Sequence, residues 1–427
     1  MPRERAAIFF VGGRIIDFDT YLPVAMELKA RAPEMRIIFV TFEPKIAQTV
    51  RDNPTLRRGL EKCGELHVLG GVGSLPLPQR LLKRARSFLQ LKAWLLTRKR
   101  PVLFLGRPFS RLPYSTSYIV TRLQGGTSVV LSKTRSPDRV HDIVWQNRSK
   151  PTAGQRSLAA RLFGKDADIT ADYHSDQSEN FNITLGLGSA RNLPHVRLGM
   201  PHLLPAWREH IDAEMNIAIE SLQEDAVSLG NNLYCMFPAK PGSSINLRQA
   251  DSVEFSLKRG LETLFEINPN ATVLMRPHPL ALDSTYVVDA LKRYGSRVRL
   301  SFLHPEVLIA LCCRSIFNNP TNITFSCFPG KLIDIADYAD RHYEERGPVA
   351  LSHGLGPLHV GPRWYDFAEK FSRALTNDDV FEDPALSNDR NTIISGAPSC
   401  LTPLLNAIGQ VGHGTIEKGL QHQHVQN

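Results

Sequence analysis

The sequence predicts an α/β fold made of two Rossmann-like parallel-sheet domains in tandem, with a cleft between them. Short apolar runs alternate with helix-periodic segments along the chain, and 427 residues are too many for one compact core. A long polar-faced helical segment divides the series in two. We expect a first domain over 1–205, a connecting helix over 206–230, a second domain over 231–400, and a partly disordered tail over 401–427.

The first domain begins as strand, glycine-led loop, helix and strand. A buried run at 6–11 is followed by "GGRIIDFD", by helical periodicity over 21–32 with Pro23 in a first turn, and by a strand over 35–42. Further strands are expected at 65–70, 101–106, 127–133, 142–145 and 195–203, and helices at 80–100 and 153–164.

The second domain repeats the alternation after the connecting helix, which ends at Gly230. It opens with "NLYCMFPAK" and a helix over 250–267, and "ATVLMRPHP" contains the next strand. The series continues through "VVDALKRY", "RVRLSF", "PEVLIALCC", "RSIFNN" and "TFSCFPGKLIDIA", and closes with a helix near 364–376. In such sheets ligands collect at the carboxyl ends of the strands.

The segment 80–100 holds eight Lys or Arg and no acid, so the rest of the chain sums to +1 of the formal net charge of +9. As a helix it has an apolar side, with Trp94 near the end and Arg86 close by. That side consists of Leu81, Leu82, Ala85, Phe88, Leu89, Leu95 and Leu96. Two interpretations stay open: a domain helix with a basic solvent face, or a helix that contacts an anionic membrane surface or glycan. Nucleic acid is not expected, since no nucleic-acid module accompanies the charge.

The six cysteines are scattered, without a CxxC pair or histidines at metal-ligand spacing. This pattern argues against a disulfide framework or structural zinc and for a reducing compartment. The first apolar run is shorter than a signal sequence requires, and no segment approaches the about 20 apolar residues of a membrane span. We expect a cytoplasmic protein, with 80–100 as the contact if it attaches to the inner membrane face.

The stretch "VLMRPHPL" (273–280) places Arg276 and His278 at the end of a buried strand. Pro277 and Pro279 restrict the backbone to extended conformations, so two donors are held in place at low entropic cost. A guanidinium fork and an imidazole suit the oxygens of a phosphate. The alternative is a proline-rich loop with a surface arginine and a capping histidine.

A polar turn follows about forty residues later, in "SIFNNPTNITFSCFPGKLIDI" (315–335). Its amide and hydroxyl side chains lie where a helix would open near Ile323, and a helix N-terminus of this kind is a natural phosphate cradle. The side chains concerned are Asn318, Asn319, Thr321, Asn322 and Thr324. Helix capping by Thr321 or Asn322 alone is the alternative that needs no ligand.

In this order the motifs resemble the nucleotide-binding half of GT-B enzymes, in particular the CDP-glycerol glycerophosphotransferase and surface-polysaccharide group. "NLYCMFPAK", "NPNATVLMRPHPL" and "HYEERGPVALSHGLGPL" each resemble a stretch of that group's second domain, and "RLGMPHL" resembles the end of its first. The resemblance covers roughly residues 195–360. This chain departs from the group's pattern in "NNPTN", where an acid and a Ser-Ser/Thr pair are usual, and in "GKL" for "GKP". The departures imply a related enzyme with altered donor specificity.

The resemblance implies transfer of a sugar or polyol phosphate from a CDP-, CMP- or UDP-linked donor to a surface-polysaccharide or glycolipid acceptor. Arg276 and His278 would grip the donor phosphate, and Thr321, Asn322 and Thr324 would complete the cradle. No metal and no other cofactor are expected, because these groups neutralise the leaving phosphate. His278 would thereby act in catalysis as well as in binding.

The first domain must then supply a base for the acceptor hydroxyl. Asp17 and Asp19 follow the first strand and are the leading candidates, with Asp176 as a further one. Capping of a helix that begins at Thr20 or Tyr21 is the alternative role of Asp19. Gly12 and Gly13 would let the acceptor approach the backbone.

Two other functions stay open. One is a sugar-nucleotide epimerase, since UDP-GlcNAc 2-epimerases share the architecture and a similar His-Pro strand end. The other is a non-catalytic, membrane-peripheral scaffold of polysaccharide assembly that uses 80–100. His353 and His359 flank the loop "GLGPL" and are interpreted as ordinary loop residues.

Overall fold

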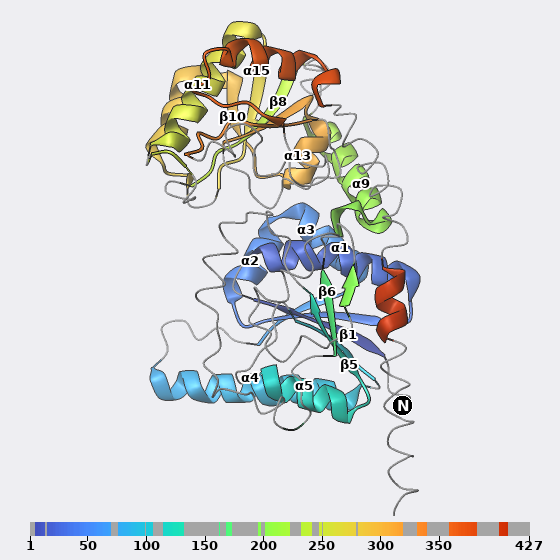
Figure 1. The fold of residues 1–427 in the computed structure, drawn as a ribbon. Coiled ribbons are helices and arrows are strands. Elements are labelled where there is room, and N and C mark those ends of the chain that lie inside the picture. Colours follow the sequence, from blue (N-terminus) through green and yellow to red (C-terminus); the bar gives the residue numbers. More distant parts are fainter. Residues whose placement is uncertain are drawn as a thin grey trace, which may run out of the picture. The chain divides into compact units, whose positions relative to one another are not determined.

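The computed structural model divides the chain into two compact units. The first contains the described residues up to Trp207 together with 401–408, and the second contains those from Arg208 to 381 (Figure 1). The residues that the structure describes are 5–12, 15–69, 76–98, 100–105, 114–131, 162, 168–172, 195–197, 201–222, 232–240, 247–249, 251–278, 281–318, 331–339, 358–381 and 401–408. The predicted α/β class with two parallel-sheet domains is confirmed. The domain boundaries given above stay predictions.

The first unit is a parallel sheet with helices on both faces (Figure 1). Its strands are β1 (Ala6–Val11), β2 (Arg36–Thr41), β3 (Glu65–Val68), β4 (Val102–Leu105), β5 (Thr127–Leu131), β6 (Ile169–Asp172) and β7 (His195–Arg197). Among the described residues these seven strands pair in the order β3-β2-β1-β4-β5-β6-β7, and all pairs are parallel. One face is covered by α1 (Ile15–Arg31), α2 (Pro44–Asp52) and α3 (Pro54–Cys63), the other by α4 (Leu77–Thr97) and α5 (Tyr114–Leu123).

Both faces of this sheet are apolar, which explains why its strands appear in the sequence as continuous hydrophobic runs. Phe9 of β1 stacks on Phe39 and Phe104 of the neighbouring strands, with ring centroids 5.2 and 4.3 Å apart. Side chains next to Phe9 point to the opposite face. There Leu91 and Leu95 of α4 are fully buried against the strands.

The helix after β1 begins earlier than the sequence predicted. It starts at Ile15, so Asp17 and Asp19 lie in the helix and not in a loop, and the interpretation of Asp19 as its cap was wrong. Pro23 lies in the helix interior, not in the first turn. Phe18 is fully buried and extends the apolar stripe of the helix toward its N-terminus.

Several predicted elements of the first domain are shorter than expected or lie outside the described residues. The strand expected over 195–203 is β7 followed by a 3-10 turn, η1 (Pro201–Leu203). The connecting helix is α9 (Pro205–Leu222), and 223–230 lie outside the described residues. So do 142–145 and all of 153–164 except Leu162.

The second unit is also a doubly covered parallel sheet (Figure 1). Its strands are β8 (Leu233–Phe237), β9 (Thr272–Met275), β10 (Val298–Leu300), β11 (Arg314–Phe317), β12 (Leu332–Asp334) and β13 (Leu358–His359). The described strands pair in the order β10-β9-β8-β11-β12-β13, all parallel. The helices are α11 (Ser252–Ile267), α12 (Thr285–Tyr294), α13 (Pro305–Leu311) and α15 (Phe367–Thr376), with 3-10 turns η4 (Gly295–Arg297) and η6 (Asp379–Phe381).

Alternate residues of β8 show how the second sheet is covered. Tyr234 and Met236 join the apolar cluster formed with α11, α12 and α15. Leu233, Cys235 and Phe237 join the cluster formed with α13. The period of two is that of a strand buried on both sides.

Each sheet reverses its strand order at its first strand. The reversal lies between β1 and β4 in the first unit and between β8 and β11 in the second. Crossover connections leave such a point in opposite directions, and ligands of open α/β sheets bind there, at the carboxyl ends of the strands. The end of β1 and the ends of β8 and β9 are therefore the edges at which a ligand is expected.

The described part of the predicted tail belongs to the first unit. Residues 402–408 are helical, and Leu401 and Leu404 are fully buried. Nη1 of Arg31 donates a hydrogen bond of 3.0 Å to Oγ1 of Thr402. A late segment of the chain thus completes the domain that begins with β1.

Candidate functional site

The site of greatest interest is the carboxyl edge of the second sheet, where β8 and β9 continue side by side beyond their last strand residues. The backbone N–H of Arg276 donates to the carbonyl of Met236, and that of His278 donates to the carbonyl of Pro238, both at 2.9 Å. Pro277, which has no N–H, lies between the two donors and is buried. The extended backbone that the prolines predicted is therefore present over 276–278.

Arg276 and His278 are two positions apart on this extended segment, so their side chains leave the same side of it. Both are partly exposed, as is Lys240, which follows β8. Burial, then the nearby charges of Lys240 and Arg276, lower the pKa of His278 below its ordinary value of 6.5. The edge thus carries two cations, Lys240 and Arg276, close enough to disfavour a proton on the imidazole of His278, an arrangement that attracts an anion. We call Lys240, Arg276 and His278 the three-base cluster.

Lys240 was not among the residues singled out in the sequence. It lies in "FPAKPG", and only the pairing of β8 with β9 shows that it belongs beside Arg276 and His278. A lysine after the first strand of a domain is a weak signal by itself. The prolines near it in the sequence, Pro238 and Pro241, were the available hint, since a proline restricts the backbone of the residue before it, as in "RPHP".

The loop after β8 is fixed from two sides. Oδ1 of Asn318 accepts a 2.8 Å hydrogen bond from the backbone N–H of Ala239, and its Nδ2 donates to the carbonyl of Val253 at 2.9 Å. The hydroxyl of Tyr286 donates to the carbonyl of Ala239 at 2.6 Å. Asn318 is 1% exposed, so its amide positions the loop that carries Lys240.

The other residues predicted for the phosphate cradle cannot be placed. Thr321, Asn322 and Thr324 lie outside the described residues, as does Asn319. Their role in binding the donor stays a prediction.

The first unit presents an acidic group at the corresponding point. Asp17, in the first turn of α1, is 3% exposed, and a Cβ added to Gly12 would overlap its Oδ2. A carboxylate in a first turn interacts favourably with the helix dipole. Asp19 is partly exposed, whereas Gly13 and Asp176 lie outside the described residues. Whether Asp17 or Asp19 serves as the base stays a prediction.

A second polar group lies at the ends of β12 and β13. Nδ1 of His359 is 3.4 Å from Oδ2 of Asp334, but the two groups are too poorly aligned for a hydrogen bond. The hydroxyl of Tyr338 donates to the same carboxylate oxygen at 2.8 Å, and His359 packs edge-on against Trp364. The interpretation of His359 as a loop residue was wrong, because it is buried at the end of a strand. His353 lies outside the described residues.

Within the described part of the chain, no three His, Cys, Asp or Glu side chains are grouped so as to hold a metal ion. The described helices also include none that is long and apolar enough to cross a bilayer.

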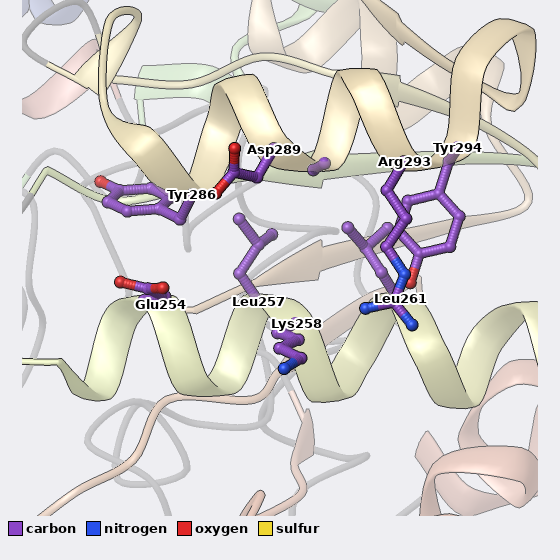
Figure 2. Close-up of a pocket in the computed structure, with 9 residues that line it drawn as sticks. Glu254, Leu257, Lys258, Leu261, Tyr286, Asp289, Arg293 and Tyr294 are labelled. Atoms are coloured by element: carbon purple, nitrogen blue, oxygen red, sulfur yellow. The ribbon is translucent and has the colours of Figure 1, made fainter.

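A pocket of about 190 Å³ lies between α11 and α12, and none of Lys240, Arg276 and His278 lines it. Figure 2 shows the side chains of the two helices pointing toward one another across it. Glu254 and Lys258 come from α11, and Asp289 and Arg293 from α12. Charges of both signs alternate along its walls, so it does not concentrate positive charge as a phosphate site does.

Comparison with known proteins gives the fold a name. No family model matches the chain, and no curated protein matches it. The UDP-N-acetylglucosamine 2-epimerase from Rickettsia bellii has 12% identity and a TM-score of 0.50, with 96% of this chain and 98% of that one covered. A putative UDP-N-acetylglucosamine 2-epimerase from Listeria monocytogenes has 13% identity and a TM-score of 0.50, with 95% of both chains covered.

A UDP-glucose: anthocyanidin 3-O-glucosyltransferase in complex with UDP has 9% identity and a TM-score of 0.50, with 96% of this chain and 99% of that one covered. At such identities the likeness is one of fold. The two sheets and their order, together with these neighbours, show that this chain has the GT-B fold.

Proposed function

We propose that this protein transfers a sugar or polyol phosphate from a CDP-, CMP- or UDP-linked donor to a surface-polysaccharide or glycolipid acceptor, without a metal ion. The proposal rests on one observation above all. Lys240, Arg276 and His278 gather at the carboxyl edge of the second sheet, beside the point where its strand order reverses. Solved structures of the same fold include a transferase and an epimerase that use UDP-linked sugars by their descriptions, which supports a sugar nucleotide as the ligand.

In this proposal the three bases bind the phosphate of the donor. As the bond to the transferred group breaks, negative charge grows on the nucleotide phosphate. Donors that are already aimed at this phosphate stabilise the transition state more than the ground state. The fixed backbone over 276–278 and the amide of Asn318 keep these donors in place, so little reorganisation is needed.

Binding is the first test of the site. A thermal-shift screen of the full chain against CMP, CDP, UDP and GDP is expected to show at least one nucleotide that raises the melting temperature. For that nucleotide, His278→Ala is expected to weaken binding by about tenfold or more and to abolish transfer. Lys292→Ala removes an exposed charge from the last turn of α12 and is the matched control. Unchanged turnover in His278→Ala would refute the assignment.

An epimerase is the second candidate, because two of the structures with this fold bear that name. Epimerisation needs no acceptor, whereas transfer does. Incubation with UDP-GlcNAc alone, followed by NMR of the sugar, distinguishes the two activities. A new sugar epimer formed without acceptor would replace the transferase proposal while leaving the phosphate site intact.

A further inference from the structure

Helix α4 has two opposite apolar faces, and among the residues that the structure describes one face is buried against its own domain while the other is exposed. Leu91 and Leu95 are fully buried against the first sheet. Trp94 also faces the domain, since it packs edge-on against His67 with ring centroids 4.5 Å apart. The single apolar side expected from the sequence was therefore wrong in part, because Leu95 belongs to the inner face.

The outer face carries a stripe of exposed leucines. Leu82, Leu89 and Leu96 follow one another at intervals of seven residues and are 74%, 67% and 46% exposed. Seven residues are nearly two turns, so the three side chains lie in one row, with the exposed Ala85 and Ala93 between them. We call this row the outer stripe. Soluble monomeric proteins seldom leave such a contiguous apolar row in water.

The first half of α4 projects from its domain. Every described side chain over 78–86 is exposed, including Leu81 at 58%. Figure 1 shows α4 extending past α5, with which it shares a face of the first sheet. The outer stripe is therefore accessible along the helix.

The charges beside the outer stripe are all basic. On a helical wheel Arg86 and Lys92 flank the stripe on its two sides, Lys83 lies further round the helix in its exposed first half, and α4 contains no Asp or Glu. Long basic side chains of this kind keep their charged ends at the level of lipid phosphates while their stems cover apolar surface. Arg86, which interrupts the apolar side in the sequence, occupies such a flanking position.

We propose that α4 binds an anionic membrane surface, with the outer stripe in the lipid and Lys83, Arg86 and Lys92 at the headgroups. Charge complementarity favours an anionic membrane as the partner of this basic helix. A second copy of the chain would bring two acid-free basic helices together, which their mutual repulsion opposes. The inference goes beyond the proposed transfer and does not depend on it, because binding is measured without donor or acceptor.

Flotation of the full chain with vesicles tests the proposal. We expect binding to phosphatidylcholine vesicles that contain about 30% phosphatidylglycerol, and much weaker binding to pure phosphatidylcholine. The triple variant Leu82→Gln, Leu89→Gln, Leu96→Gln is expected to bind about tenfold more weakly or worse. The triple variant Lys83→Gln, Arg86→Gln, Lys92→Gln is expected to bind about 100-fold more weakly.

Matched controls lie in the second unit. Leu300→Gln with Phe302→Gln removes exposed apolar surface, and Lys258→Gln, Lys292→Gln and Arg373→Gln together remove three exposed charges. Both controls should float as the unsubstituted protein does, and all variants should keep its melting temperature. Undiminished flotation of the leucine variant would overturn the proposal. A second outcome would also overturn the proposal. In it the unsubstituted protein binds no vesicles but self-associates in sedimentation velocity, and the leucine variant has lost this self-association.

Discussion

At the point where the first sheet reverses its strand order, Gly12 lies beneath the buried carboxylate of Asp17. At the same point of the second sheet, Lys240, Arg276 and His278 are partly exposed and basic. The two sheets share their parallel pairing and a strand order that reverses beside the first strand. In open α/β sheets the topology fixes the edge at which a ligand binds, and the residues after each strand determine which ligand that edge can accept.

The two sheet edges should differ most in their effect on nucleotide affinity. On the proposal that Arg276 binds the donor phosphate, Arg276→Ala should lose charge-assisted hydrogen bonds and weaken nucleotide binding by about 10- to 100-fold. Asp17→Ala, at the counterpart position, should leave nucleotide binding unchanged. Isothermal titration of both variants provides the measurement. Equal losses of affinity in the two variants would contradict this assignment, because both sheet edges would then contribute to nucleotide binding.

Stability should depend more on the edge of the first sheet than on that of the second. Gly12→Ala forces its new methyl group against Oδ2 of Asp17 and should destabilise the chain by about 1–3 kcal/mol. In an Asp17→Ala background the same substitution should cost much less, because the overlapping oxygen is gone. Denaturant unfolding of the two single variants and the double variant gives the coupling energy.

Lys240→Ala is the corresponding stability test for the edge of the second sheet. Because Lys240 is partly exposed at an open edge, its removal should change stability by about 0.5 kcal/mol or less. A larger loss would show that the second edge is also held together by its charged groups.

The pH dependence of stability should be the smallest effect. Burial, Lys240 and Arg276 lower the pKa of His278 below 6.5, so the folded chain binds fewer protons there than the unfolded chain. The contribution of His278 to the free energy of unfolding is therefore complete above about pH 6.5, and it is lost as the pH falls toward the lower pKa of the folded state. Thermal melts of the protein and of His278→Gln between about pH 5 and 8 should diverge only at the acid end.

A bound phosphate reverses this trend, since it favours the protonated imidazole. Affinity for a nucleotide sugar should therefore rise as the pH falls below about 6.5, and His278→Gln should lose that rise. UDP-glucose is the suitable probe, because its phosphates do not titrate in this range. Affinity that falls on acidification would contradict an anion at His278.

Local chemistry made part of the site predictable. Proline on both sides of an imidazole restricts the backbone whatever surrounds it, and Arg276 and His278 do lie on the predicted extended segment. Lys240 escaped notice because its place depends on β8 pairing with β9, a contact between residues far apart in the chain. The role of Asn318 was not predictable for the same reason, because its amide hydrogen-bonds the loop after β8, which lies far from it in the sequence.

The fold was predictable wherever apolar runs were strong, as in β1, β2 and β9. The start of α1 was missed because Asp17 is a polar residue in a buried first turn, and Pro23 suggested a helix that begins later. His359 was missed because β13 has only two residues, too few for a strand pattern. In each case packing against distant elements decides the structure, and local sequence does not report it.

The hydrogen bond between Arg31 and Thr402 joins residues 371 positions apart. During synthesis the N-terminal domain leaves the ribosome first, yet the segment with Leu401 and Leu404 emerges only after the second domain has been made. Part of the apolar surface of the first domain therefore stays exposed until the end of the chain has been synthesised. A fragment that stops at Trp207 would retain that defect permanently, so expression of the isolated domain calls for the terminal helix to be supplied as well.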